Sequence, residues 1–219
     1  VLFRSIINPD LFIPQAEASG LIAPMTWQLM RSVAEQLEEY CGQFPEHFHL
    51  SFNISGACCK NNRLLGECRR FLAHTRAKNI QLVLEITERE TLITDGSTIQ
   101  LIEDISNMGV RLAIDDFGTG YSTMNMLKNQ TLDEIKIDRE FIRDLEKDKS
   151  QIIIRNTIAM LQQLGAHIVI EGVETEEQKE FLLGCNCTDV QGFLFYRPMP
   201  VEEFDKLLWQ QERELDMAK

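Results

Sequence analysis

Two adjacent carboxylates, Asp115 and Asp116, stand where a buried strand is expected to end. Residues 110–114 before them are mostly apolar, which predicts a parallel strand covered on both faces. Because two like charges side by side repel, the pair predicts a cation in the same site, and Mg²⁺, Mn²⁺ or Ca²⁺ suits oxygen ligands. Gly118 and Gly120 let the backbone turn sharply and approach a ligand closely. The alternative is an ordinary acidic turn that caps the next helix.

The elements that must position these carboxylates follow an alternation of short apolar runs and longer amphipathic ones. Strands are expected at 49–54, 80–86, 110–114, 134–137, 167–170 and 190–196, and helices from Pro24 to about residue 41 and at 62–76, 98–108, 150–164 and 201–217. A further helix is expected to start at Thr175, which can form a capping box with Gln178. Strands separated by helices in this way pair in parallel through right-handed crossovers.

The polar residues at the strand ends decide between a closed barrel and an open sheet. They lie at or near the carboxyl ends of different strands: Asn53, Glu85, Asp115, Asp116, Lys136, Glu171 and Gln191. Such residues converge on one point only if the strands close around it, as at the top of a (β/α)₈ barrel. An open doubly wound sheet would place its chemistry at one crevice, usually beside a glycine-rich first turn, and the sequence lacks that turn. A chain of 219 residues that is 44% hydrophobic is long enough for one such core.

Lys136 is expected to lie close to these carboxylates. Ile135 and Ile137 share one face of the expected strand, so Lys136 points to the other face, which is the interior of a barrel. A buried ammonium needs anionic partners, and the carboxylates at the neighbouring strand ends can supply them. Asp138, directly after this strand, is interpreted as the cap of the next helix rather than as a substrate contact.

Two chemistries use such a set of residues. A barrel lysine can form a Schiff base with a carbonyl substrate. Alternatively, oxygen ligands can hold hard cations that promote the attack of water on a phosphodiester, while Lys136 stabilises the water or the developing charge. The number of carboxylates favours the second chemistry, because a Schiff-base lysine must lose its proton and neighbouring negative charge opposes that loss.

Composition excludes several other classes. The formal net charge of −12 argues against a DNA, RNA or anionic-membrane surface. The six cysteines form no Cys-x-x-Cys pair, so they are expected to be reduced thiols of a cytoplasmic protein rather than zinc ligands. The sequence has no signal-peptide pattern and no apolar run of membrane-spanning length, and it does not begin with Met. We therefore expect a cytoplasmic domain that was cut from a longer protein.

Six motifs in this order resemble one family along essentially the whole chain. They are Asn53-Ile-Ser55, Glu85-Ile-Thr-Glu88, Asp115-Asp-Phe-Gly-Thr-Gly-Tyr-Ser122, Lys136-Ile-Asp138, Glu171-Gly-Val-Glu174 and Gln191-Gly-Phe-Leu-Phe195, with Phe12-Ile-Pro-Gln-Ala-Glu17 near the start. The chain resembles the EAL-domain phosphodiesterases of bacterial cyclic di-GMP signalling. The resemblance implies one domain over residues 1–219, a TIM-like (β/α)₈ barrel of the α/β class whose first strand runs antiparallel to the others.

The resemblance also implies a reaction and a role for each matching residue. The reaction is metal-dependent hydrolysis of cyclic di-GMP to linear pGpG with two Mg²⁺ or Mn²⁺ ions. Asn53, Glu85, Asp115, Asp116 and Glu171 are similar to the metal ligands, and Lys136 to the residue that positions the attacking water. Glu174 and Gln191 are similar to supporting groups around metal, water and substrate, and Glu88 to the anchor of the loop 117–122. The family also implies a homodimer through the loop and helix after Asp116.

The N-terminus departs from the family pattern. The family motif is Glu, then Ala or Val, then Leu-x-Arg-Trp, whereas this sequence opens with Val1-Leu2-Phe3-Arg4-Ser5. Arg4 then corresponds to the residue that contacts the substrate phosphate, the signature glutamate lies before Val1, and the stretch Ser5–Asn8 is shorter than in the family. Without that ligand, a catalytically inactive cyclic di-GMP receptor or protein-interaction domain is the alternative function. Any membrane anchoring, for instance in the bacterial inner membrane, would come from modules outside this chain.

Overall fold

The structure is a computed structural model that describes residues 7–39, 44–45, 48–75, 79–87, 96–118, 133–204 and 206–208. The chain divides into two compact units, residues 1–136 and 137–219, and the division falls within strand β4 (Glu134–Ile137). The first unit contains α1 (Pro9–Ala18), α2 (Ile22–Glu39), β1 (Phe48–Asn53), α3 (Gly56–Cys59), α4 (Arg63–Thr75), β2 (Ile80–Thr87), α5 (Gly96–Ser106) and β3 (Arg111–Phe117). The second unit contains α7 (Glu140–Arg143), α8 (Asp148–Gln163), β5 (His167–Ile170) and α9 (Glu176–Leu183).

The strands of the first unit form a parallel sheet. β1 pairs in parallel with β2, β2 pairs in parallel with β3, and β4 follows β3 in the strand order. In this register Asn53 lies opposite Glu85, and Thr87 lies opposite Asp115. Parallel pairing therefore brings the candidate site residues of three strands to the same edge of the sheet, as the sequence predicts.

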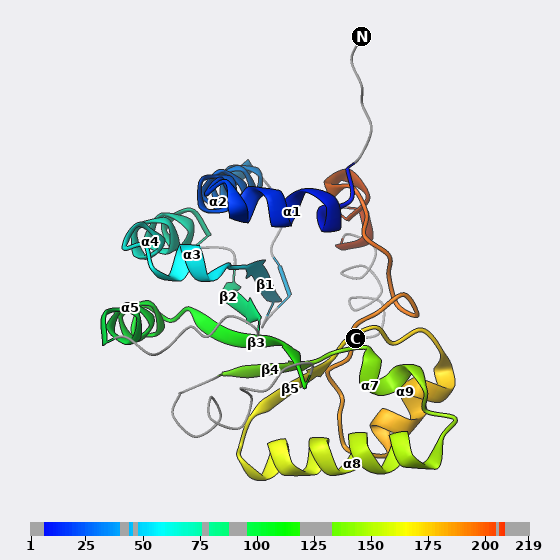
Figure 1. The fold of residues 1–219 in the computed structure, drawn as a ribbon. Coiled ribbons are helices and arrows are strands. Elements are labelled where there is room, and N and C mark those ends of the chain that lie inside the picture. The colour runs from blue at the N-terminus through cyan, green and yellow to red at the C-terminus, as the bar shows by residue number, and fades with distance from the viewer. Residues whose placement is uncertain are drawn as a thin grey trace. The chain divides into compact units, whose positions relative to one another are not determined.

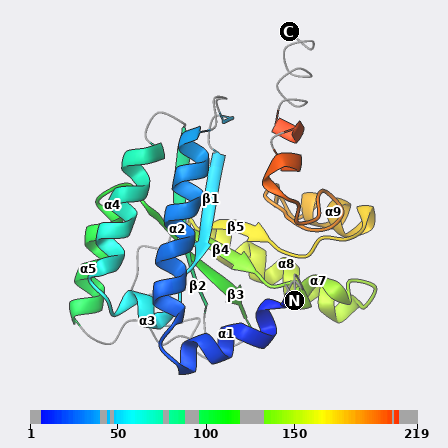
Figure 2. The same ribbon diagram turned by 90° about the horizontal axis from the view of Figure 1, so that it is seen from above.

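A layer of helices covers one face of this sheet. Figures 1 and 2 show α2, α4 and α5 on the same side of β1, β2 and β3. The core between the two layers is apolar and closely packed; Phe52 of β1 meets Phe71 of α4 edge to face, with ring centroids 5.4 Å apart. The strand residues in this core are Phe52, Ile54, Leu82, Leu84, Ile86, Val110 and Leu112. Because strand side chains alternate, Asn53, Glu85 and Asp115 point to the other face.

The second unit is built around β5 and α8, which pack against each other (Figure 1). Ile154, Ile158 and Leu161 recur along α8 at helical spacing and are buried, as is Ile170 of β5. The backbone N–H of Glu171 donates to the carbonyl of Ile137, which joins the end of β5 to the end of β4 within this unit. Thr175 and Gln178 form the predicted capping box of α9.

Most expected elements are confirmed within a few residues, and the main differences are the following. The strand expected at 190–196 is wrong: only Val190 forms a bridge, to Ile170, and a turn follows because Phe195 and Tyr196 both donate to the carbonyl of Gly192. Helix α1 was not expected; Pro9 in its first turn and the Asn8 side chain, which accepts from the Asp10 N–H, start it. Strand β3 continues to Phe117, so the two aspartates lie inside the strand rather than after it.

Three further expectations concern the last helix, the cysteines and membrane-spanning segments. The helix expected at 201–217 is present where the structure describes it, at 201–204 and 206–208. The described cysteines, Cys58, Cys59, Cys68, Cys185 and Cys187, are free thiols, as expected. None of the described helices combines the length and the apolar character that a bilayer crossing requires.

Candidate active site

A buried ion cluster forms at the carboxyl end of the sheet in the first unit. The Lys136 Nζ atom lies 2.9 Å from Oε1 of Glu85 and 3.9 Å from Oδ1 of Asp115. Lys136 and Glu85 are each only 5% exposed. A charge at this depth persists only when an opposite charge and hydrogen bonds replace its lost hydration. The structure thus confirms that Lys136 points away from its isoleucine neighbours and meets the carboxylates.

The alternation of strand side chains explains why these three residues meet. Leu84 and Ile86 enter the core beneath the helices, so Glu85 between them lies on the opposite face of β2. In β4, Ile135 and Ile137 are fully buried on the face that Lys136 does not use. Each of the two strands therefore carries one polar residue between two apolar ones. Burial of the apolar neighbours alone determines the face of the sheet to which the polar side chain points.

Asp116 interrupts this alternation. Its backbone φ angle is +56°, in the left-handed region that costs most residues other than glycine about 1 kcal/mol. Its N–H donates to Oδ1 of Asp115 at 3.0 Å, so the Asp115 carboxylate accepts from the neighbouring backbone and lies beside Lys136. Strained backbone held in place by its surroundings is common at functional sites. Asp116 thus departs from regular strand geometry while it still lies within β3.

The second unit brings two other predicted residues together. The Gln191 amide Nε2 donates to Oε1 of Glu171 at 2.7 Å. Backbone hydrogen bonds hold the two segments side by side: Gln191 donates to Ile170, Val173 donates to Gln191, and Leu194 donates to Val173. This close approach requires Gly192, because a Cβ atom there would lie 2.2 Å from the Val173 carbonyl oxygen.

The remaining predicted residues have different placements. Asn53, at the end of β1, is exposed and lies opposite Glu85 in the register. Glu174 is exposed, and its backbone N–H donates to the side chain of Gln178 at the start of α9. Asp138 accepts from the N–H of Glu140 at 2.7 Å, but it lies one residue before Arg139, which is the N-cap of α7. Glu88, Arg4 and the loop residues 119–122 lie outside the described residues.

Three of the predicted metal ligands, Asn53, Glu85 and Asp115, come from three neighbouring strands. Within the described ranges, no group of three or more His, Cys, Asp or Glu side chains is close enough together to hold an ion. The donor chemistry nevertheless suits a hard cation, because Asn53, Glu85 and Asp115 present amide and carboxylate oxygens from the same face of the sheet. Lys136 already neutralises part of this negative charge, so a bound cation would share the two carboxylates with the ammonium.

Sequence reasoning missed two further features. At the opposite, amino-terminal end of the sheet, buried Glu134 lies 3.7 Å from Nδ1 of His49, whose Nε2 lies 3.3 Å from an Arg111 nitrogen. In the second unit, the Arg197 guanidinium lies over the Phe193 ring, two residues after Gln191. A run of aromatic residues ending in a cation was the available sequence signal for the second feature.

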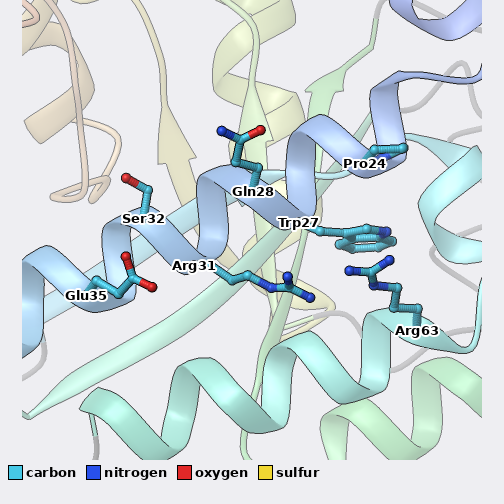
Figure 3. Close-up of a pocket in the computed structure, with 7 residues that line it drawn as sticks. All are labelled: Pro24, Trp27, Gln28, Arg31, Ser32, Glu35 and Arg63. Carbon is cyan, nitrogen blue, oxygen red and sulfur yellow. The ribbon is translucent and has the colours of Figure 1, made fainter.

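A hollow of about 510 Å³ lies elsewhere in the first unit, on α2 and α4. Figure 3 shows Trp27, Arg31 and Arg63 on the side where the two helices face each other. Arg31 and Arg63 both donate to the carboxylate of Glu67, which is only 4% exposed. These hydrogen bonds, chiefly that from Arg31, hold the pKa of Glu67 below its usual value. The cluster joins α2 to α4, and it contains none of the predicted site residues.

Comparison with known proteins decides the family. The model of the family described as EAL domain matches residues 4–198. The chain belongs to the EAL domain family. Among curated relatives, a probable cyclic di-GMP phosphodiesterase, PdeG of Escherichia coli K12, is 38% identical over 203 residues, which is 92% of this chain and 40% of that protein. The cyclic di-GMP phosphodiesterase PdeL of the same strain is 36% identical over 91% of this chain and 55% of its own length. This chain therefore spans about half the length of these relatives.

Solved EAL domains share the fold. The phosphodiesterase MucR in complex with c-di-GMP matches with a TM-score of 0.77 and 35% identity, over 90% of this chain and 87% of that chain. An EAL domain protein from Listeria monocytogenes matches with a TM-score of 0.70 and 26% identity, over 93% and 80%. The predicted α/β class and TIM-like barrel fold are thereby confirmed. Among the described strands β1 runs parallel to β2, and the antiparallel first strand stays a prediction.

Proposed function

We propose that this EAL domain hydrolyses one phosphodiester bond of cyclic di-GMP to give linear pGpG. The observation that carries the proposal is Lys136 buried between Glu85 and Asp115 at the carboxyl end of a parallel sheet. That edge is where barrel enzymes place their catalytic groups. Relatives at 36–38% identity that are named cyclic di-GMP phosphodiesterases support the same activity.

Lys136 acts here as a charged donor rather than as a nucleophile. Two carboxylates beside a buried amine stabilise its protonated form and oppose Schiff-base chemistry, which requires the neutral amine. A fixed ammonium can orient the attacking water and balance the negative charge that develops on the phosphate oxygens. Glu85 fixes the position of Nζ by a 2.9 Å contact, so the ammonium needs little reorganisation during the reaction.

We propose Asn53, Glu85, Asp115, Asp116 and Glu171 as the ligands of divalent cations, Mg²⁺ or Mn²⁺ and two in number. EAL phosphodiesterases generally depend on divalent metals. Such ions would supply positive charge against the attacking and leaving oxygens. Gln191 would orient Glu171 through the 2.7 Å hydrogen bond, and Glu174 would serve as a further support. We also propose that Glu88 anchors the loop 117–122 and that Arg4 contacts the substrate phosphate.

Further proposals concern the whole domain. Residues 1–219 form one barrel domain of a longer protein, and it works in the cytoplasm. It forms a homodimer through the loop and helix after Asp116. Its ligand is cyclic di-GMP rather than DNA or RNA, because the net charge of −12 repels a polyanion over most of the surface. Any membrane contact is made by modules outside this sequence.

The experiment that tests the activity is hydrolysis of cyclic di-GMP with Mg²⁺ or Mn²⁺, with pGpG followed by chromatography. It compares this sequence with a version extended by the native residues before Val1. Turnover in either protein that is lost in Lys136→Ala, while cyclic di-GMP still binds, would support the enzyme. Binding without turnover in both versions would instead assign the domain to the receptor class.

A further inference from the structure

The segment after β5 carries two proposed site residues but belongs to no helix or strand. β5 ends at Ile170 and α9 begins at Glu176, so Glu171 and Glu174 lie between the two elements. We call residues 171–174 the glutamate loop. Side chains on such a segment keep a fixed direction only if other parts of the molecule hold its backbone in place. The contacts of the glutamate loop therefore determine how Glu171 is directed.

The first of these contacts is made at Gly172, which packs directly against Arg139. A Cβ atom at position 172 would collide with the Cβ atom of Arg139 and would lie 3.5 Å from its Cα atom. The φ angle of Gly172 is +70°, in the left-handed region that favours glycine. Position 172 thus requires glycine for two separate reasons, the space beside Arg139 and the backbone conformation.

Arg139 is itself held in place, because it is the N-cap of α7. Its carbonyl accepts from the N–H of Ile142 within that helix. Two residues before Arg139, the carbonyl of Ile137 accepts from the N–H of Glu171. The start of α7 and the residues before it therefore meet the glutamate loop at two successive positions, by a hydrogen bond at Glu171 and by packing at Gly172. Since the peptide between these two positions is planar, holding both of them fixes the direction in which the Glu171 side chain leaves the backbone.

The other end of the glutamate loop is also tied to α7. The side-chain oxygen of Gln178 accepts from the N–H of Glu174 at 2.8 Å, and its Nε2 donates to the carbonyl of Ile142 at 3.1 Å. Gln178 is the residue of the capping box that starts α9. A helix of only four residues, α7, therefore supports the loop at both ends.

We propose that α7 is a positioning element for the proposed metal ligand Glu171, and that Gly172 is the residue through which it acts. This inference rests on the proposed function. Because position 172 has no side chain, Arg139 can approach closely enough to fix the backbone of Glu171, while Gln191 orients its carboxylate by a hydrogen bond. Gly172 has no side chain to offer a ligand, so it is a positioning residue rather than a catalytic one. Groups that orient a metal ligand typically change metal affinity or activity by about 10–100-fold.

Titration of Mn²⁺ by calorimetry, together with kcat and KM for hydrolysis of cyclic di-GMP, tests the proposal. Gly172→Ala should weaken Mn²⁺ binding about tenfold or more and lower kcat more than it raises KM. Gly165→Ala is the matched control in the same unit. Gly165 has a φ angle of +76°, and no atom lies within 4 Å of the place where its Cβ would stand. This variant therefore introduces the same backbone strain without the collision, and its Mn²⁺ affinity should be unchanged.

Substitutions of Arg139 separate the collision from a loss of charge. Arg139→Gly removes the Cβ atom that a side chain at position 172 would meet, and glycine is tolerated at an N-cap. Gly172→Ala combined with Arg139→Gly should therefore regain Mn²⁺ affinity to within about threefold of the unaltered chain. Arg139→Ala keeps the Cβ atom and removes the guanidinium, so it should give no such recovery. Arg139→Gly alone loosens the support without a collision and should weaken Mn²⁺ binding about threefold relative to Arg139→Ala, which tests the proposal even if Gly172→Ala does not fold.

The outcomes distinguish this inference from the proposed function. Equal Mn²⁺ affinity in Gly172→Ala and Gly165→Ala would overturn the inference, and so would equal recovery by Arg139→Gly and Arg139→Ala. If the unaltered chain and its version extended before Val1 neither bind Mn²⁺ nor hydrolyse cyclic di-GMP, the proposed function fails together with the inference. Hydrolysis by either of them, with the same Mn²⁺ affinity in both alanine variants, would overturn the inference alone.

Discussion

The proposed site residues of the two units are held by opposite means. In the first unit, Lys136 and Glu85 form an ion pair that is almost completely buried. In the second unit, a neutral amide donates to the Glu171 carboxylate in an exposed hydrogen bond, and the backbone fixes the segment. A buried charge pair keeps its geometry because separating it leaves an unsolvated charge. Substitutions at Lys136 or Glu85 are therefore expected to lower both activity and stability. Substitutions at Gln191 or Glu171 are expected to lower activity with little change in stability.

Removal of Lys136 should have the largest effect. Lys136→Ala leaves Glu85 buried without its cation, so the free energy of unfolding should fall by about 3 kcal/mol or more, and turnover should be lost. The double variant Lys136→Met with Glu85→Leu removes both charges and should regain much of the stability but none of the turnover. Urea unfolding and a pGpG assay measure the two quantities. A Lys136→Ala protein with full turnover would refute the role of the lysine.

Glu67 tests whether burial alone explains the loss of stability. Its carboxylate is as buried as Glu85 and accepts from Arg31 and Arg63, but it lies in the helix layer. Glu67→Gln should lower the free energy of unfolding by about 1–3 kcal/mol at pH 7 with unchanged turnover. If Glu67→Gln lost both turnover and stability, as Lys136→Ala is expected to do, activity would depend on general stability. The proposed difference between the site residues of the two units would then not hold.

The pH dependence of the Glu67 effect has a definite sign. The pKa of Glu67 is lower in the folded protein than its usual value of 4.5. Its contribution is therefore complete above about pH 4.5 and is lost as the pH falls through the folded pKa. The difference between the unaltered protein and Glu67→Gln should shrink in acid. Asp144, paired with Lys147 on the surface, is the matched control, and Asp144→Asn should not change stability measurably.

Substitution of Gln191 in the second unit should reduce turnover and leave stability nearly unchanged. Gln191→Leu removes the hydrogen bond to Glu171 at an exposed position, so the melting temperature should change little. If Glu171 is a metal ligand, losing the residue that orients it should reduce turnover about tenfold or more and raise the metal requirement. Gln162→Leu is a suitable control because Gln162 also donates from its amide, to Cys185 and Asn186, away from Glu171. Equal kinetic effects of the two variants would contradict the assigned role.

The part of the site that depends on strand periodicity could be predicted from the sequence. Lys136 lies between Ile135 and Ile137, and a period of two assigns its face without knowledge of its partners. The Glu67 cluster could not be found in this way, since Arg31 is 36 residues away and only the packing of α2 against α4 joins them. The turn at Gly192 was missed for a related reason: apolar residues at 193–196 have the composition of a strand, but Gly192 must pack against Val173.

Substitution of Asp116 by glycine is expected to change stability least among these variants. Asp116→Gly relieves the strain of a φ angle of +56°, so the free energy of unfolding should rise by up to about 1 kcal/mol, while turnover and metal affinity should fall with the loss of the carboxylate. Asn79 has a φ angle of +57° and lies outside the proposed site, so Asn79→Gly should give the same gain in stability with unchanged turnover. Thermal unfolding and metal titration compare the two variants. A decrease in stability for Asp116→Gly alone would mean that its carboxylate, rather than the strain, dominates the energetics there, and that both units hold their site residues through side-chain contacts.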